Sequence, residues 1–394
     1  MIVIADDITG AAEIAGIAFT QRQAVSLLCE CPVSGDIIAT TGFAATTVIA
    51  TDTRSMTEAE AVAETRRIAS AITFFGGDGG RGEVLPSFGG AGGGFFKKTD
   101  SALRGHVVAE LTALMQATGY RRAVYMPANP SKGRTIRNGI YYIDGTPIAD
   151  TAFSYDPEFP ARTSSLCECF PDAEAKGIIM PDAESEADIR ALVDRYDDGH
   201  TLFAGAADLF KAIAPLNPPE GGRNESSKPV LPLSGGLRGW GAFLPPSGGL
   251  RGALLVCGST QSHPDAFGLP VAEMPFSIYD GSDDLTPWLN DALDKYAAGP
   301  LVIAITHRHR TGRDVAVRLR RLTAQLVEAL FRHHTPSHLY IEGGATAFSV
   351  LHTLGISRLT VTAQPAPGVV SMTAPDGLVV TLKPGSYPFR FHHD

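Results

Sequence analysis

The 394-residue sequence has few of the features that mark membrane, secreted or nucleic-acid-binding proteins. It contains no apolar run near the roughly 18 residues that a membrane-spanning helix needs. A charge already appears at Asp6, too early for the basic and apolar regions of a secretion signal. The formal net charge of −9 argues against nucleic acid or an anionic membrane as a general partner. We therefore expect a cytoplasmic protein that binds neither.

Cysteine is also scarce, with five residues at positions 29, 31, 167, 169 and 257. An odd number without a secretion signal predicts free thiols. The tetrapeptide Leu-Cys-Glu-Cys occurs twice, but its C-x-C spacing differs from the C-x₂₋₄-C spacing of structural zinc sites. On a strand, C-x-C simply places two small side chains on one face. The histidines show no ligand spacing either, so no protein metal site is predicted.

Apolar runs alternate with helical patterns along most of the chain. Strands are predicted at 2–5, 24–30 and 47–53, and helices at 10–21 and 57–72. Such alternation predicts an α/β fold with a mainly parallel sheet and helices on both faces. The sequence GIYYIDGTPI further along predicts a β-hairpin that turns at Asp144-Gly145.

Two low-complexity stretches interrupt this pattern. Residues 76–94 contain ten glycines in nineteen positions, which is typical of a surface loop. Residues 215–252 are rich in Pro, Gly and Ser and repeat the sequence LP(L/P)SGGLRG, which is typical of a linker. The α/β pattern restarts after it. We predict two domains, 1–214 and 253–394, each a mainly parallel sheet flanked by helices, joined by the 215–252 linker.

Two adjacent aspartates, Asp6 and Asp7, follow the first predicted strand directly. Ligands of open α/β sheets bind at the carboxyl ends of the strands. Carboxylates at such a place can accept a hydrogen bond from a substrate hydroxyl or take its proton. The alternative interpretation is a pair of helix-capping acids, because the dipole of the following helix would offset their repulsion.

Charged and hydroxyl side chains cluster in loops after two later strands. Residues 97–105, KKTDSALRG, combine cations, a carboxylate and hydroxyls, and Arg104 is suited to bidentate contact with a substrate carboxylate. Arg134, between a glycine and a threonine, has the same capacity for an anion. The alternative interpretation of 97–105 is an ordinary polar loop.

Glycine-containing turns recur in the predicted second domain. Residues 258–263 (GSTQSH) follow a strand, and residues 342–347 (EGGATA) join a strand to a helix. Glycines at such junctions let backbone N–H groups approach a phosphate at the helix N-terminus. For these two turns, nucleotide binding and an ordinary turn are equally good interpretations. Residues 383–385 are a candidate third loop near the same site.

Taken in order, these motifs resemble the four-carbon acid sugar kinase family. The most specific parts are IADDITGA at 4–11 and KKTDSALRG at 97–105, and the resemblance covers nearly the whole chain apart from the two low-complexity stretches. It implies an N-terminal acid-sugar domain, a C-terminal nucleotide domain, and phosphorylation of threonate, erythronate or 3-oxo-tetronate with ATP and Mg²⁺.

Carried over motif by motif, the resemblance implies that Asp7 or Asp100 is catalytic and orients or deprotonates the attacking hydroxyl. The further residues facing the acid sugar would be Asp6, Ser101, Arg104 and Arg134. The residues lining the nucleotide site would be Ser259, Gly343, Gly344, Ala345, Thr346 and Gly385. The family usually has an aspartate where this chain has Ala345, and this departure bears on ATP binding.

We therefore hypothesise an ATP-dependent kinase acting on a hydroxyl of a small sugar acid. Ala345 and the insertions suggest the alternative of a catalytically impaired kinase relic that still binds a sugar acid. An oxidoreductase is disfavoured because no predicted strand is followed by the sequence G-x-G-x-x-G. A homodimer is a possible assembly.

Overall fold

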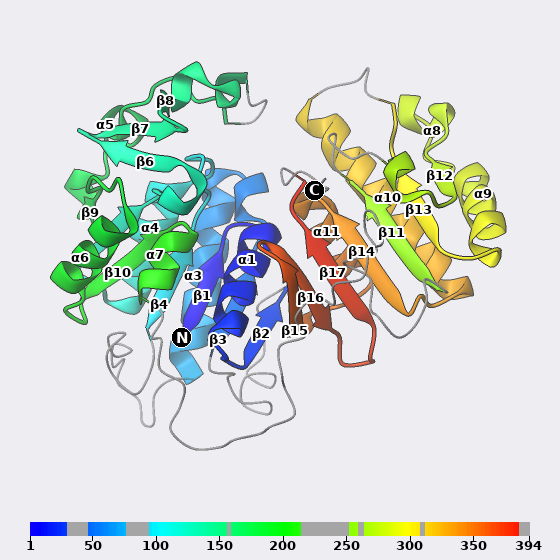
Figure 1. The fold of residues 1–394 in the computed structure, drawn as a ribbon, viewed down its shortest axis with the longest axis horizontal. Helices are drawn as coiled ribbons and strands as arrows, with labels where there is room; N and C mark the ends of the chain where they lie inside the picture. The colour runs from blue at the N-terminus through cyan, green and yellow to red at the C-terminus, as the bar shows by residue number, and fades with distance from the viewer. Residues whose placement is uncertain are drawn as a thin grey trace, which may run out of the picture. The chain divides into compact units, whose positions relative to one another are not determined.

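The computed structural model describes residues 1–29, 46–75, 94–155, 159–213, 252–258, 264–307 and 312–385. The chain divides into two compact units, Met1–Pro218 and Pro219–Asp394, each an α/β structure on a mainly parallel sheet (Figure 1). This confirms the predicted fold class. Almost all of the glycine-rich stretch and of the linker lies outside the described residues. Of the helices described, none combines the length and apolarity needed to cross a membrane.

The first unit contains a parallel sheet with strand order β2-β3-β1-β4-β10-β5-β9. Its strands are β1 (Ile2–Ala5), β2 (Val25–Leu28), β3 (Thr46–Ala50), β4 (Phe95–Lys98), β5 (Arg122–Met126), β9 (Ile178–Ile179) and β10 (Thr201–Gly205). Every residue of β1 is buried, as expected for an apolar strand covered on both faces.

Helices cover both faces of this sheet. They are α1 (Ile8–Thr20), α3 (Glu58–Phe75), α4 (Val107–Thr118), the short α5 (Leu166–Cys169), α6 (Glu186–Tyr196) and α7 (Ala207–Ile213). Helices α3 and α4 pack together on one face, and α1 and α7 lie on the other (Figure 1). Beneath α3 and α4 lies a core that includes Ile68, Phe95, Leu111 and Tyr125.

A small antiparallel sheet of β6 (Arg134–Arg137), β7 (Ile140–Ile143) and β8 (Thr146–Pro147) follows β5. The predicted hairpin is confirmed, because β7 and β8 pair across a turn in which Asp144 and Gly145 have φ of 50° and 78°. Two positive φ values are what a type I′ hairpin turn requires.

The second unit has strand order β12-β13-β11-β14-β17-β16-β15, parallel from β12 to β17 and antiparallel beyond. The strands are β11 (Ala253–Cys257), β12 (Val271–Glu273), β13 (Leu301–Ala304), β14 (His338–Glu342), β15 (Arg358–Ala366), β16 (Val369–Thr373) and β17 (Val379–Lys383). Its helices are α8 (Phe276–Asp280), α9 (Thr286–Ala297), α10 (Arg313–His333) and α11 (Gly344–Thr353).

The same strand connection occurs in both units. From β1 the chain runs out to β2, returns to β3 beside β1, and then crosses to β4 on the other side. From β11 it runs out to β12, returns to β13, and crosses to β14. Each crossing creates a switch point, and ligands of open α/β sheets bind outside the carboxyl ends of strands at such points. The carboxyl ends of β1 and β11 are therefore the places to look for sites.

Candidate functional site

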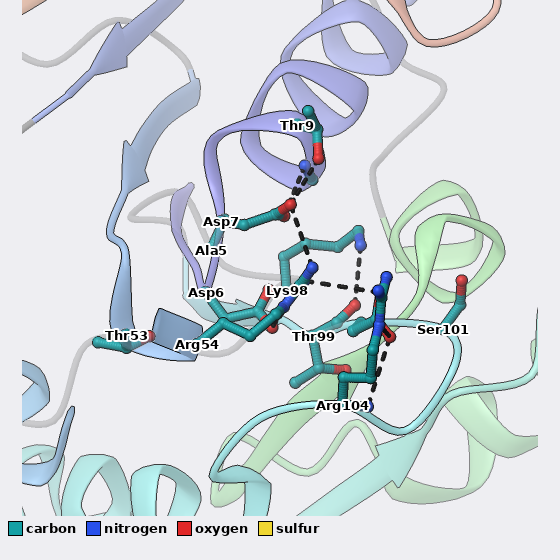
Figure 2. A network of polar contacts seen from close by, with 12 residues as sticks. Ala5, Asp6, Asp7, Thr9, Thr53, Arg54, Lys98, Thr99, Ser101 and Arg104 are labelled. Carbon is teal, nitrogen blue, oxygen red and sulfur yellow. Dashed lines mark hydrogen bonds and ion pairs between the residues drawn. The ribbon is translucent and has the colours of Figure 1, made fainter. Parts of the chain in front are cut away.

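Three loops of the first unit meet at the carboxyl end of β1. Asp6 and Asp7 follow β1, and Arg54 follows β3 (Figure 2). Asp100 follows β4. Backbone bonds join the loops, because Asp6 N donates to Lys98 O at 3.3 Å and Arg54 N donates to Asp6 O at 3.3 Å. The residues of the two most specific motifs are thus brought together in space.

A single guanidinium, that of Arg54, binds three carboxylates. Its Nε and Nη2 donate to Asp6 Oδ2 at 3.1 and 2.9 Å, and its Nη1 donates to Asp7 Oδ2 at 3.2 Å. Arg54 Nη2 also lies 3.6 Å from Asp100 Oδ1. Only 15% of the Arg54 side chain is exposed, so water screens these attractions weakly. The positive charge of Arg54 offsets the mutual repulsion of the three aspartate carboxylates.

Asp7 is the N-cap of α1. Its Oδ1 accepts a hydrogen bond from Gly10 N at 2.8 Å, and its Oδ2 accepts one from the Thr9 hydroxyl. A Cβ added at Gly10 would lie 2.7 Å from Asp7 Oδ1 and 3.2 Å from Lys98 Nζ, so a larger residue would displace the Asp7 carboxylate from its capping position. Burial would raise the pKa of Asp7, but Arg54, Lys98 and these hydrogen bonds bring it below its usual value. The capping interpretation therefore describes Asp7.

Asp100 is held by Arg104. Arg104 Nε donates to Asp100 Oδ2 at 2.8 Å and Nη2 donates to Oδ1 at 3.0 Å, which is the bidentate geometry that suits this pair. Ala102 N adds a third bond to Oδ2 at 2.9 Å. Burial opposes ionisation of Asp100, yet Arg54 and Arg104 outweigh it and hold its pKa far below the usual range.

Asp6 differs from both neighbours. It is only 2% exposed, and burial raises its pKa above the usual value although Arg54 acts in the opposite direction. The two bonds from Arg54 both reach Oδ2, while Oδ1 is buried and has no hydrogen-bond partner in the described part of the chain. Asp6 therefore has one buried acceptor oxygen that no donor among the described residues satisfies.

The consecutive lysines of β4 point to opposite faces of the sheet, as alternation along a strand requires. Lys97 Nζ lies 2.5 Å from Glu110 Oε2 of α4, and both side chains are almost fully buried. Lys98 lies on the α1 side, where its Nζ donates to Thr99 O at 2.8 Å and lies 3.7 Å from Glu13 Oε2. Lys98 is thus the lysine of the pair that reaches the aspartate cluster.

Two arginines of the predicted substrate site face one aromatic ring. Arg104 Cζ lies 5.9 Å and Arg134 Cζ lies 5.7 Å from the centre of Phe153, which follows the small sheet. Arg134 also donates to the Ser101 hydroxyl. Within the described residues Arg134 has no carboxylate partner, unlike Arg104. A half-buried guanidinium without a counter-ion is suited to an anionic ligand.

A buried carboxylate anchors the loop that precedes Arg134. Asp208 of α7 accepts bonds from Ser131 N and the Ser131 hydroxyl, each at 2.8 Å. Lys211 Nζ donates to the same carboxylate at 2.8 Å. The loop is therefore tied to the main sheet's helices, which fixes where β6 and Arg134 begin.

The sequence reasoning missed Arg54 and Phe153. The rule that ligands bind at the carboxyl ends of strands, which singles out Asp6 and Asp7, applies equally to β3, whose carboxyl end leads to Arg54. That signal was present. Phe153 lies in a 3-10 turn, Ala152–Tyr155, and no periodic pattern distinguishes it in the sequence.

In the second unit, three parallel strand ends meet at the predicted nucleotide loops. Gly258 N donates to Glu342 O at 3.0 Å, and Gly343 N donates to Lys383 O at 3.0 Å. Glu342 and Lys383, both buried, form an ion pair of 2.7 Å, and they lie one residue before Gly343 and two residues before Gly385 respectively. Gly343 is the N-cap of α11, with φ of 99°.

The remaining predicted nucleotide residues lie at the same edge where they are described. Thr346 packs on Gly258 so closely that a Cβ added to this glycine would lie 2.0 Å from Thr346 Oγ1. Ala345 is exposed in the first turn of α11, and Gly385 follows β17. Ser259 lies outside the described residues. Backbone N–H groups at a glycine-lined helix N-terminus fit the phosphates of a nucleotide.

No group of three or more His, Cys, Asp or Glu side chains that could hold a metal ion occurs in the described residues. Mg²⁺ in phosphoryl-transfer sites is commonly bound by substrate phosphates with only one or two carboxylates. Glu342, the carboxylate that ends β14 at this edge, is paired with Lys383.

Two protein families match the chain. Residues 1–174 match the family described as sugar-binding N-terminal domain. Residues 269–387 match the family described as nucleotide-binding C-terminal domain. The first match contains the aspartate cluster, and the second contains the glycine turns of α11.

Several curated proteins are similar to this chain. D-threonate kinase of Cupriavidus necator is 26% identical over 93% of this chain and 89% of its own length. The 3-oxo-tetronate kinase of Actinobacillus succinogenes is 26% identical over 73% of this chain and 76% of its own length. D-threonate kinase of Salmonella typhimurium is 30% identical, but the match spans 30% of this chain and 35% of that protein.

Solved structures share the fold. A protein described as a putative tRNA synthase from Salmonella typhimurium aligns with a TM-score of 0.70 at 18% identity, over 98% of this chain and 96% of its own. A Haemophilus influenzae protein aligns with a TM-score of 0.63 at 20% identity, over 98% and 97%. Together with the two family matches and the relatives that span both units, the motif order places this chain: it belongs to the four-carbon acid sugar kinase family.

Proposed function

We propose that this chain phosphorylates a hydroxyl group of a four-carbon sugar acid, with ATP as the phosphate donor. Membership of the family makes it a phosphotransferase that acts on an alcohol group. The relatives named above support threonate and 3-oxo-tetronate as candidate substrates, and the motif resemblance adds erythronate.

The proposal that the substrate carries a carboxylate rests on the surroundings of Arg134. Its guanidinium is half-buried, rests on Phe153 and has no carboxylate partner in the described part of the chain. Arg104 lies against the same ring but is already paired with Asp100. Arg134 is therefore the guanidinium with capacity for a substrate carboxylate, while Ser101 beside it can bind a neighbouring oxygen.

The aspartate cluster supports the hydroxyl part. A sugar acid presents several hydroxyl donors, and ionised carboxylates are pure acceptors. Asp7 and Asp100 were the predicted catalytic residues, but the oxygens of both are engaged by hydrogen bonds and cations. We assign these two to shaping the site and take up the catalytic base below.

The second unit supports the ATP part. When bound, ATP with Mg²⁺ supplies the phosphoryl group and neutralises charge on its phosphates. Backbone N–H groups of Gly344 and Ala345, in the first turn of α11, would hold phosphate oxygens, with Thr346 behind them and Gly385 at the neighbouring strand end. We also propose 1–214 and 253–394 as the domain limits.

The test is an ADP-release assay with D- and L-threonate, D- and L-erythronate and 3-oxo-tetronates. Threitol and erythritol, which lack the carboxylate, serve as matched neutral compounds. We expect turnover with at least one acid and little with either polyol. Arg134→Gln should raise KM for that acid about 10- to 150-fold, the loss of one hydrogen bond to a charged group.

Arg137→Gln is the matched control, because Arg137 ends the same strand but is 54% exposed and pairs with Glu184. Its KM should stay within twofold of wild type. Equal KM values for Arg134→Gln and wild type would refute the carboxylate role.

The exposed Ala345 favours one alternative, a catalytically impaired relic that binds a sugar acid. Tight binding of an acid in calorimetry without ADP release from any of them would establish the relic. A homodimer stays a prediction, which light scattering at assay concentration would test.

A further inference from the structure

We propose that Asp6, and neither Asp7 nor Asp100, is the base that takes the proton from the attacking hydroxyl, with Thr99 hydrogen-bonding the same hydroxyl oxygen. This inference rests on the proposed kinase activity. It assigns the catalytic step to a residue that the sequence placed only among the substrate-binding groups.

The first observation is the unequal use of the two Asp6 oxygens. Arg54 directs two N–H groups at Oδ2, which fixes the plane of the carboxylate. Oδ1 is buried and accepts nothing in the described part of the chain. A buried acceptor left unpaired costs about 1–3 kcal/mol, so native proteins rarely keep one without a reason. A ligand hydroxyl that donates to Oδ1 is such a reason.

The second observation is an unpaired hydroxyl on the neighbouring strand end. Ala5 pairs with Lys98 in the parallel register of β1 and β4, so Asp6 and Thr99 are the next residues along, at adjacent strand ends (Figure 2). Thr99 is 2% exposed, and its Oγ1 has no hydrogen-bond partner in the described residues. A ligand hydroxyl can donate to Asp6 Oδ1 and accept from Thr99 Oγ1, which satisfies both atoms at once.

The other two carboxylates are committed elsewhere. Protonation of Asp7 would weaken the cap of α1, and protonation of Asp100 would break the bidentate pair with Arg104. The pKa of Asp6 is raised by burial, while those of Asp7 and Asp100 are lowered by the cations around them. Neighbouring carboxyl groups whose pKa values diverge are typical of a division between a proton-transfer role and a structural role.

The proposed step transfers the γ-phosphoryl group of ATP to the substrate hydroxyl. The hydroxyl oxygen forms a bond to the γ-phosphorus of ATP, and its proton passes to Asp6 Oδ1. The bond from that phosphorus to the bridging oxygen breaks, and ADP leaves with the electron pair. Asp6 then releases the proton to solvent, and Arg54 stays ionised throughout.

The experiment compares Asp6→Asn with Asp7→Asn, the same change one residue away beside the same arginine. Asparagine keeps an acceptor oxygen but is no base at neutral pH. We expect Asp6→Asn to lower kcat by about 10²–10⁴-fold, with the Kd of the sugar acid, measured by calorimetry without ATP, within about threefold of wild type. Asp7→Asn should lower kcat about tenfold or less and keep the acidic limb of the kcat–pH profile, which Asp6→Asn should lose.

Thr99→Val provides a second, independent measurement if Asp6→Asn does not fold. Because it replaces an unpaired buried hydroxyl with a methyl group, this variant should unfold at the same or a higher urea concentration than wild type. It should nevertheless weaken binding of the sugar acid about three- to tenfold. Lower stability with unchanged binding would mean that the hydroxyl is structural.

The failures are distinguishable. A kcat of Asp6→Asn within tenfold of wild type would overturn the role of Asp6 as the base but not the proposed kinase activity. The same holds if the acidic limb of the kcat–pH profile disappears in Asp7→Asn and persists in Asp6→Asn. Absence of turnover by the wild-type chain with every acid would overturn the proposed function, and this inference with it.

Discussion

Replacement of Arg54 by methionine should destabilise the first unit, and by an amount that depends on pH. Methionine keeps much of the side-chain volume but removes the guanidinium that binds Asp6, Asp7 and Asp100. Asp7 retains its bonds from Gly10 and the Thr9 hydroxyl, and Asp100 retains its own arginine. Asp6 is the carboxylate that loses both of the hydrogen bonds its side chain accepts from Arg54.

The cost at Asp6 has an upper limit, because the carboxyl group can take up a proton instead of standing unpaired. Removing one partner of a buried ion pair typically costs about 3–5 kcal/mol. Keeping Asp6 protonated against an unfolded-state pKa near 3.9 costs about 4 kcal/mol at pH 7 and about 1.5 kcal/mol at pH 5. A raised folded-state pKa means that the folded state binds more protons, so stability recovers as pH falls. The loss should therefore be about 3–4 kcal/mol at pH 7 and at most about 1.5 kcal/mol at pH 5.

The assay is urea unfolding followed by circular dichroism at both pH values. Arg54→Lys keeps the charge without the planar fork, so its loss at pH 7 should lie between those of wild type and Arg54→Met. Arg66→Met is the matched control, because Arg66 is exposed on α3 and donates a hydrogen bond to the neutral side chain of Gln116. This variant should change stability by less than about 0.5 kcal/mol. A loss below 1 kcal/mol at pH 7, or a loss that grows at pH 5, would refute the reasoning.

Two further predictions concern buried charge. Glu110→Gln should lower the free energy of unfolding in urea by about 3–5 kcal/mol, because it leaves the buried Lys97 ammonium without its counter-ion. The double variant Lys97→Met, Glu110→Leu should recover most of that loss. Equal losses in both variants would contradict this prediction. Burial lowers the pKa of His338 to about 4. The unfolded chain therefore takes up the proton first, and the free energy of unfolding should fall by about 2.5 kcal/mol as pH drops from 6.5 to 4. His338→Gln should remove this dependence, measured by fluorescence of Trp288 in the same unit, and an unchanged slope would count against it.

Strong local signals let the sequence predict much of the fold. The acidic start of α3 and the Asp-Gly turn after β7 are encoded by neighbouring residues, and both are confirmed. Context decided other segments. The tetrapeptide Leu-Cys-Glu-Cys forms helix α5 at 166–169, although its first copy begins at the end of β2, so the idea of C-x-C on a strand is wrong for the second copy. Strand β10 was not predicted, although it lies between β4 and β5.

The candidate site divides in the same way. Motif positions predicted that Asp6, Asp7 and Asp100 would share a strand-end region, because parallel strands end at one edge. Which oxygen of each carboxylate is occupied depends on Arg54, which is 48 residues from Asp6 in sequence. No local pattern carries that information, so the roles within the cluster required the folded arrangement.

The two lysines of β4 also protect the pairing of a central strand. A one-residue slip that moves Phe96 into the place of Lys97 would exchange the two faces of β4 and leave the Glu110 carboxylate facing an aromatic ring. Three buried charges would then lose their partners, at several kcal/mol each, whereas a purely apolar strand would lose only some packing contacts. The adjacent buried charges therefore disfavour this shifted register of β4 in the folded sheet, whether or not a ligand is bound.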